Sequence, residues 1–242
     1  MSTTRVMLAE LIGTFFLCFA GIAAIVSTGA PIESGVGLLG IALAHGLALS
    51  VAVNCFGGVS GAHFNPAVTI GMLTVRRITS VRAVQYIIAQ LAGASLAAWA
   101  CTIFFPPQAV SASQLGIPLP FPLPGEEGAW ITVPIVLGVE FVLTFLLMTA
   151  IFGTAVDERG QAVKIGGFGI GLTVTFDILA CGKLTGASMN PARSFGPAFI
   201  FKLTGGEAGE NAFAIHWCYW AAPIAGAVVA ALIYEYVILR ND

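Results

Sequence analysis

Charged residues are scarce in this 242-residue chain, which has 10 basic and 12 acidic residues that together make up 9% of it. The formal net charge is −2, and no run of Lys or Arg is long enough to indicate a nucleic-acid surface. Hydrophobic residues account for 57% of the chain, and the mean hydropathy is +0.93. Because so little polar surface cannot cover a soluble globule, the composition indicates an integral membrane protein with no nucleic-acid partner.

Several other signals are missing. The chain has no Asn-x-Ser/Thr sequon and its tails are short, which favours the cell (plasma) membrane of a microbe. The histidines and cysteines lack the spacing of a metal site, and there is no recognisable nucleophile elbow. We therefore expect no metal, no cofactor and no enzymatic activity. Unpaired, membrane-buried thiols are expected at Cys18, Cys55, Cys101, Cys181 and Cys218.

Long apolar runs are the most prominent feature that is present. A transmembrane helix needs about 20 predominantly apolar residues. The segments that meet this requirement are 7–29, 36–56, 83–105, 131–154, 163–182 and 213–238. The sequence therefore predicts an all-α membrane protein with six transmembrane helices.

Two shorter apolar segments each begin at the same tripeptide, Asn65-Pro66-Ala67 and Asn190-Pro191-Ala192. Asn is a strong N-cap, and Pro is well tolerated at the first position of a helix. Each segment is about ten residues long, so at about 1.5 Å per residue it covers half of a hydrocarbon core of roughly 30 Å. We predict two half-helices that enter from opposite faces and meet inside the bilayer, with their positive dipole ends together.

The two halves of the chain resemble each other. Glu10 and Thr14 in the first span match Glu140 and Thr144 in the fourth. Because each half holds an odd number of spans, the second half must be inverted relative to the first.

The domain organisation follows from this repeat. Residues 1–242 are expected to form a single transmembrane domain, with repeat halves at about 1–105 and 131–242 joined by a proline-rich linker at 106–130. Most basic residues fall in loops on the side of both termini, which predicts that the N- and C-termini are cytoplasmic.

The segments 60–69 and 185–194, which contain the two tripeptides, resemble the signature loops of the aquaporin, or major intrinsic protein, family. The resemblance covers essentially the whole chain, including the span count and the paired glutamates. It implies the aquaporin fold of six transmembrane helices plus two half-helices, and a homotetramer in the lipid bilayer with one pore in each protomer. It also implies passive passage of water and small neutral solutes with exclusion of protons and ions.

The resemblance and the physics of a narrow pore together suggest roles for individual residues. The two tripeptides would form the pore centre, and Arg193, a costly charge at this depth, would belong to the constriction with His45, Ile178 and Ala187. Carbonyl groups facing water are expected at Gly61, Ala62, His63, Gly186, Ala187 and Ser188.

Three other acids and one histidine lie near these loops. Glu10 and Glu140 are expected to be buried acceptors for loop N–H groups, and the ring of His63 is expected to hold its loop. Asp177 is expected either to cap a loop N–H or to face an oligomer contact.

The His-Ile-Ala-Arg set departs from the sets of familiar water-selective members and of glycerol facilitators. It is similar to that of plant tonoplast-type members, for which water together with ammonia, and in some cases urea or hydrogen peroxide, is implied. Ser194, Ala198 and the pair Tyr219-Trp220 also disfavour glycerol. One alternative is a facilitator mainly for ammonia, urea, hydrogen peroxide or glycerol. A less favoured alternative is a secondary transporter, a class that usually needs carboxylates for a coupling ion near the membrane midplane.

Overall fold

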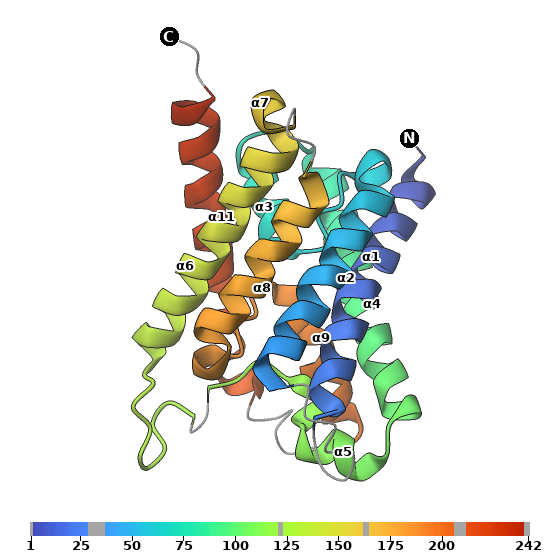
Figure 1. Cartoon of the computed structure of the whole chain (residues 1–242), viewed down its shortest axis with the longest axis vertical. Coiled ribbons are helices and arrows are strands. Elements are labelled where there is room, and N and C mark those ends of the chain that lie inside the picture. Colours follow the sequence, from blue (N-terminus) through green and yellow to red (C-terminus); the bar gives the residue numbers. More distant parts are fainter. Residues whose placement is uncertain (1, 29–36, 121–122, 162–164, 206–211, 240–242) are drawn as a thin grey trace.

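The computed structural model describes residues 2–28, 37–120, 123–161, 165–205 and 212–239, and every regular element in these ranges is helical. The elements are α1 (Thr3–Val26), α2 (Gly37–Ser60), α3 (Pro66–Thr74), α4 (Ser80–Phe104), α5 (Pro107–Ala112), η1 (Gln114–Gly116), α6 (Val133–Ile151), η2 (Phe152–Val156), α7 (Glu158–Gln161), α8 (Gly166–Thr185), α9 (Pro191–Leu203), α11 (Cys218–Ile233) and η3 (Tyr234–Ile238). The long helices form one bundle, and both chain termini lie at the same end of it (Figure 1). We call this end the terminal face.

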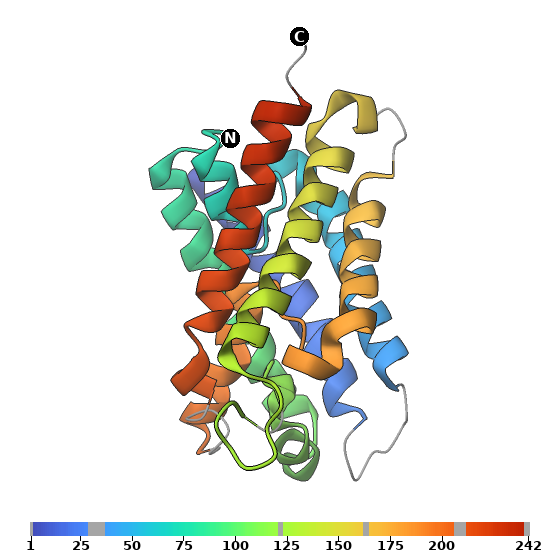
Figure 2. The same cartoon turned by 90° about the vertical axis from the view of Figure 1, so that its left-hand side faces the viewer.

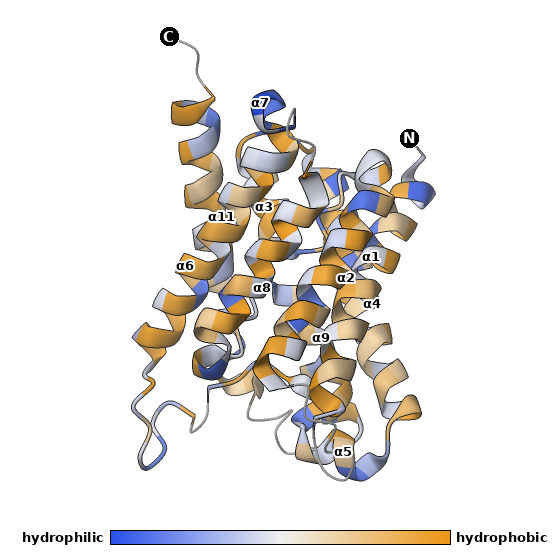
Figure 3. Ribbon diagram, in the orientation of Figure 1, coloured by the Kyte–Doolittle hydropathy of each residue, from blue (hydrophilic) through white to orange (hydrophobic). Residues whose placement is uncertain are grey.

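Six helical segments in the described ranges are long and apolar enough to cross a membrane. They are Thr3–Val26, Gly37–Ser60, Ser80–Phe104, Val133–Val156, Gly166–Thr185 and Ala212–Ile238. Hydrophobic residues cover most of the long helices, and hydrophilic residues gather at their ends (Figure 3). Large apolar side chains such as Leu39, Val84 and Val237 are exposed, as expected for side chains that face lipid. The chain is therefore a multi-pass integral membrane protein, and the prediction of six spans is confirmed.

Helices α3 and α9 are the two short helices. Each begins at a proline, and the preceding asparagine is extended and caps the helix: the Oδ1 atoms of Asn65 and Asn190 accept from the N–H groups of Ala67 and Ala192 at 2.8 and 2.9 Å. Helix α3 lies toward the terminal face and α9 toward the opposite face (Figure 1). Helix α9 has 13 residues and continues past Lys202, whose ammonium lies 5.6 Å from the ring centroid of Phe213.

Helices α2 and α8 are symmetry-related partners that cross at two glycines. A Cβ atom on Gly46 would overlap Thr175 and the backbone of Gly171, and one on Gly171 would overlap Ser50 and the backbone of Gly46. The close approach brings the two helices together beside the half-helices. Figure 2 shows α8 and α2, coloured orange and light blue, on one side of the bundle.

The other two long-helix pairs, α1 with α4 and α6 with α11, approach each other in the same way. A Cβ on Gly93 would overlap the carbonyl of Leu11, and one on Gly226 would overlap the carbonyl of Phe141. These repeat-related glycines let the backbones approach closely, as is typical of membrane bundles.

The proline-rich segment 106–130 is more ordered than the expected linker. Pro107 starts the short helix α5, and Leu115, which is fully buried, anchors η1 in the core. Three consecutive residues with positive φ, Gln114, Leu115 and Gly116, turn the backbone at this point toward the centre of the bundle. The segment therefore forms part of the site described below.

The basic residues are unevenly distributed between the two faces. Arg5, Arg76, Arg77, Arg82 and Arg159 lie near the terminal face, whereas Glu126, Glu127, Lys183 and Lys202 lie near the opposite one. The orientation prediction also uses charged residues that lie outside the described part of the chain. These are Glu33, Lys164, Glu207, Glu210 and Arg240.

Candidate functional site: the junction of the half-helices

The half-helices meet through two reciprocal hydrogen bonds. Nδ2 of Asn65 donates to the carbonyl of Met189 at 2.8 Å, and Nδ2 of Asn190 donates to the carbonyl of Phe64 at 2.9 Å. The Oδ1 atoms already accept from the first turns of α3 and α9, which turns each amide nitrogen away from its own helix. Each nitrogen carries a second hydrogen, for which the described residues provide no acceptor. Two N–H donors are therefore available at this point.

Glu10 of α1 holds the first loop. Its Oε1 accepts from the Ser60 hydroxyl at 2.6 Å and from the His63 N–H at 3.0 Å, and its Oε2 accepts from the Phe64 N–H at 2.7 Å. Gln90 donates to the same carboxylate at 2.8 Å. The carboxylate thus satisfies buried N–H groups that no helix satisfies.

Glu140 of α6 does the same for the second loop. It accepts from the Thr185 hydroxyl at 2.7 Å, from the Ser188 N–H at 2.9 Å and from the Met189 N–H at 2.8 Å. Sequence analysis placed this acid correctly in the repeat, but it did not predict the threonine that completes the arrangement.

These bonds hold both loops in an unusual backbone conformation. Ala62 and Phe64 have φ values of 53° and 49°, and Ala187 and Met189 have values of 42° and 54°. Left-handed conformations of non-glycine residues cost roughly 1–3 kcal/mol each, and they persist only where the surroundings impose them. Within the described part of the chain, no protein group donates to the carbonyls of Gly61, Ala62, His63, Gly186, Ala187 and Ser188.

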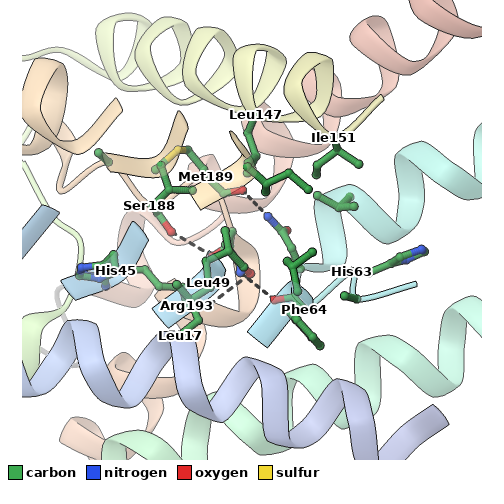
Figure 4. Close-up of a pocket in the computed structure, with 18 of the residues that line it drawn as sticks. Leu17, His45, Leu49, His63, Phe64, Leu147, Ile151, Ser188, Met189 and Arg193 are labelled. Carbon is green, nitrogen blue, oxygen red and sulfur yellow. Dashed lines mark hydrogen bonds between the residues drawn. The ribbon is translucent and has the colours of Figure 1, made fainter. Parts of the chain in front are cut away.

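A narrow cavity of about 30 Å³ passes the junction. Both asparagines line it, together with apolar side chains that include Leu49, Leu147 and Val174 (Figure 4). His45 and His63 lie at opposite ends of the cavity in this view. A cavity this small admits only a few water-sized molecules between His45 and His63, so it suits water in single file.

Wider cavities adjoin both ends of the narrow one. The cavity at the terminal face has a volume of about 530 Å³ and shares His63 and Ile151 with the narrow cavity. The cavity at the opposite face has a volume of about 220 Å³ and shares His45, Ile178 and Arg193 with it. The shared wall residues place the three cavities one after another through the bundle.

The narrow cavity ends near the opposite face in a segment that we call the neck. All four residues of the expected constriction lie there. His45, Ile178, Ala187 and Arg193 line the narrow cavity. Arg193 is 4% exposed, and its Nη1 donates to the Gly116 carbonyl at 2.8 Å. Its Nη2 lies 3.4 Å from Nε2 of His45.

The hydrogen bonds of His45 define its protonation. Nδ1 lies 2.8 Å from the Ile41 carbonyl, which can only accept, so this nitrogen carries a hydrogen. Nε2 faces the guanidinium of Arg193, which can only donate, so this nitrogen is an acceptor. His45 is therefore a neutral imidazole.

Sequence reasoning missed Gly116, because nothing in the sequence pairs a carbonyl in the proline-rich segment with Arg193. It also missed the tyrosines that fix the ends of α2 and α8: the hydroxyls of Tyr86 and Tyr219 donate to the Ser60 and Thr185 carbonyls, each at 2.6 Å.

The expectations for Asp177 were wrong. The residue is fully buried within the protomer, so it does not face an oligomer contact. Neither carboxyl oxygen has a hydrogen-bond partner among the described residues, so it caps no described loop N–H.

Comparison with known proteins identifies the family. The family model described as major intrinsic protein matches residues 1–234. The chain is 41% identical to aquaporin AqpM of Methanothermobacter thermautotrophicus, with 98% of each chain covered, and 39% identical to maize aquaporin TIP4-4, with 96% of this chain and 85% of that protein covered. It is also 41% identical to glycerol uptake facilitator protein-like 6 of Lactiplantibacillus plantarum, with 94% and 95% covered.

The fold is that of a solved structure from the same family. The chain matches the aquaglyceroporin of Plasmodium falciparum with a TM-score of 0.85 and 26% identity, covering 98% of each chain. Together with its two capped half-helices, these similarities show that the chain belongs to the major intrinsic protein family and is a passive channel for water and small solutes rather than an enzyme.

Proposed function

We propose that the chain is a water channel that also conducts ammonia and excludes protons and ions. One observation carries the proposal: the junction of two opposed half-helices places two free N–H donors, from Asn65 and Asn190, on a passage with a wider cavity at each end. Water that enters such a passage loses most of its bulk hydrogen bonds. A conducting wall must return some of them while staying apolar elsewhere.

The two loops are suited to that role. The unpartnered carbonyls of residues 61–63 and 186–188 offer acceptors along the passage, and the asparagine N–H groups offer donors at its middle. Apolar side chains such as Leu49, Val53 and Val174 cover the rest of the narrow wall. Water can thus move from acceptor to acceptor without binding tightly at any point.

Exclusion of protons and cations follows from the same geometry. A water molecule that accepts from both asparagines points its own hydrogens outward, toward the two mouths, which interrupts a continuous proton wire. The N-terminal ends of α3 and α9 add positive potential at this point, and Arg193 adds a full positive charge at the neck. Neutral solutes meet no comparable barrier.

The neck supports ammonia as a second solute. Its wall combines a neutral imidazole at His45 with the aliphatic Ile178 and the small Ala187. This wall is more polar and less bulky than one containing a phenyl or indole ring, so it favours a small molecule that both donates and accepts hydrogen bonds.

The paired test is stopped-flow permeability of the same proteoliposomes to water, ammonia, urea and glycerol. We expect both water and ammonia to pass faster than through protein-free vesicles. In His45→Phe, ammonia permeability should fall more than water permeability. Leu39→Phe, on the lipid-exposed side of the same helix, is the matched control and should change neither. Faster glycerol than water transport, or saturable transport that needs an ion gradient, would refute the proposal.

We further propose that the protein is a homotetramer in the plasma membrane of a microbe, with the terminal face in the cytoplasm. The excess of arginine at that face supports this orientation. This orientation is tested with single cysteines introduced at Ser2, on the terminal face, and at Glu127, on the opposite face. Each cysteine is labelled in intact cells with a reagent that does not cross the membrane. Reaction at Ser2 alone would reverse the orientation.

A further inference from the structure

The wide cavity at the terminal face has an unbalanced charge. It lies between the loop that follows α3, the start of α4 and the end of α6, and its volume is about 530 Å³. The charged side chains that line it are those of Arg77 and Arg82, and none of its described lining residues is acidic. A pocket with two guanidinium groups and no carboxylate in its wall favours an anionic occupant.

Arg77 is only partly neutralised. Its Nε and Nη2 atoms donate to the Glu235 carboxylate of η3 at 2.6 and 3.2 Å, and its guanidinium carbon lies 5.7 Å from the ring centroid of Phe152. Nη1 has no acceptor among the described residues. Glu235 itself does not line the cavity, so the wall remains positive.

Arg82 is not neutralised at all within the described part of the chain. It forms no ion pair there, and its Nη1 is buried without a hydrogen-bond partner. Nη1 itself is enclosed by protein atoms, but Arg82 lines the cavity, so its uncompensated positive charge acts on an anion there.

The start of α4 adds further donors beside Arg82. Thr79 caps this 25-residue helix by accepting from the N–H of Arg82 at 3.3 Å. Within the described residues, no group accepts from the N–H groups of Ser80 and Val81. Thr79 and Arg82 of this helix start line the cavity, and a helix N-terminus beside an arginine favours an oxyanion.

We propose that this mouth binds a phosphate-type oxyanion between Arg77 and Arg82. Because His63 and Ile151 line both this cavity and the narrow passage, a bound anion lies directly over the entrance and lowers water flux. The second part of this statement rests on the proposed water-channel function, whereas binding itself does not. The phosphate group comes either from free phosphate or from the headgroup of an anionic lipid.

Binding is measured first, in a way that does not depend on transport. Purified protein in detergent is heated in inorganic phosphate or in chloride at matched ionic strength. We expect phosphate to raise the midpoint of thermal unfolding in a saturable way. The shift should be lost in Arg82→Gln, reduced in Arg82→Lys, and retained in Arg76→Gln, a neighbouring exposed arginine that does not line the cavity. The site for free phosphate would be overturned if phosphate did not shift the midpoint of the wild-type protein. It would also be overturned if the shift were equal in wild type, Arg82→Gln and Arg76→Gln.

The source and the effect are measured next in vesicles. One set contains only phosphatidylcholine, with and without inorganic phosphate on both sides; the other contains added phosphatidylglycerol and no phosphate. A fall in water permeability with phosphate identifies the free anion as the ligand, and a fall with phosphatidylglycerol identifies the lipid headgroup. In either case Arg82→Gln must abolish the fall. No fall in either set overturns the effect on flux. If wild-type protein conducts no water, the channel proposal fails, while the thermal shift still tests the anion site.

Discussion

The two halves of the molecule have nearly the same scaffold and different pore surfaces. In each half a glutamate accepts from a hydroxyl and two loop N–H groups, a tyrosine fixes the loop, and an asparagine reaches across to the other loop. Equivalent hydrogen bonds in the two halves differ in length by about 0.1–0.2 Å at most. The repeat therefore preserves the parts that hold the half-helices in place.

The halves differ where side chains meet the passage. Val68 follows Asn65 at the position where Arg193 follows Asn190. Ile170 of α8 corresponds to His45 of α2, and both line the narrow cavity. Single replacements on a symmetric scaffold thus put an imidazole and a guanidinium at one end of the narrow cavity, while the equivalent positions in the other half, Val68 and Ile170, are apolar.

A third difference lies behind the passage. Ala52 stands as far before Asn65 as Asp177 stands before Asn190, and both side chains are fully buried. The first half keeps an apolar group at this position, and the second half keeps an unpartnered carboxyl. Among the described residues, the second half therefore carries at this position a buried polar group that the first half lacks.

The largest effect is expected from removing the loop acceptor in each half. Glu140→Ala leaves a hydroxyl and two N–H groups without their acceptor, at about 1–3 kcal/mol for each group that stays buried. Glu10→Ala also releases the Gln90 amide, but it should cost less, because the Ser60 hydroxyl and the His63 N–H are only partly buried and can turn to water, whereas all three donors to Glu140 are buried. Thermal unfolding in detergent measures both variants. A Glu10→Ala protein that is less stable than Glu140→Ala would contradict this difference between the halves.

The next effect concerns selectivity. Arg193→Val copies Val68 into the second half and removes the charge from the neck. We expect the ratio of cation to water permeability to rise about tenfold or more. A barrier lowered by about 1.36 kcal/mol raises a rate tenfold, and the repulsion between a poorly hydrated arginine and a passing cation exceeds that energy. Proteoliposome flux assays measure the ratio, with Val68→Leu as the control. An unchanged ratio would remove Arg193 from the selectivity account.

A smaller effect is expected behind the passage. Asp177→Ala copies Ala52 and removes an unpartnered buried carboxyl. Removing that group should stabilise the protein by about 1–3 kcal/mol, and the cavity left by the smaller side chain offsets part of this gain. The reverse change, Ala52→Asp, should destabilise it. The midpoint of thermal unfolding measures both. If Asp177→Ala proves less stable than wild type by a similar amount, then Asp177 has a partner, and the second half depends on it.

The smallest effect lies at an ion pair in the second half, between Asp157 and Arg159. Hydrogen bonds from the Arg159 side chain lower the pKa of Asp157, at the terminal face, to about 2. A lowered folded-state pKa means that the carboxylate stabilises the protein above its usual pKa of about 3.9 and that this contribution is lost as the pH falls toward 2. The stability gap between wild type and Asp157→Asn should therefore close between about pH 4 and pH 2. A gap that stays constant over this range would rule out the ionic contact as its cause.

Much of this architecture could be predicted because the membrane allows few solutions. Spans are visible as apolar runs, and Asn-Pro-Ala predicts a capped helix start through Asn65 and Asn190 alone. Repeat symmetry then pairs Glu10 with Glu140. These features are local in sequence, or they follow from a simple rule about buried N–H groups.

Long-range contacts could not be predicted in this way. The carbonyl of Gly116 reaches Arg193 only because Leu115 packs into the core and turns the backbone, which no pattern in the segment announces. The isolation of Asp177 depends on the side chains of other helices.

The central claim is that the passage between the opposed half-helices conducts water, and osmotic shrinkage of proteoliposomes tests it most directly. Wild-type vesicles should shrink much faster than protein-free vesicles. Val174→Trp, which places an indole in the narrow cavity, should return the rate close to that of protein-free vesicles, while Leu39→Trp at the lipid-exposed surface should not. Wild-type vesicles that shrink no faster than protein-free ones, or Val174→Trp vesicles that shrink as fast as wild type, would contradict the account.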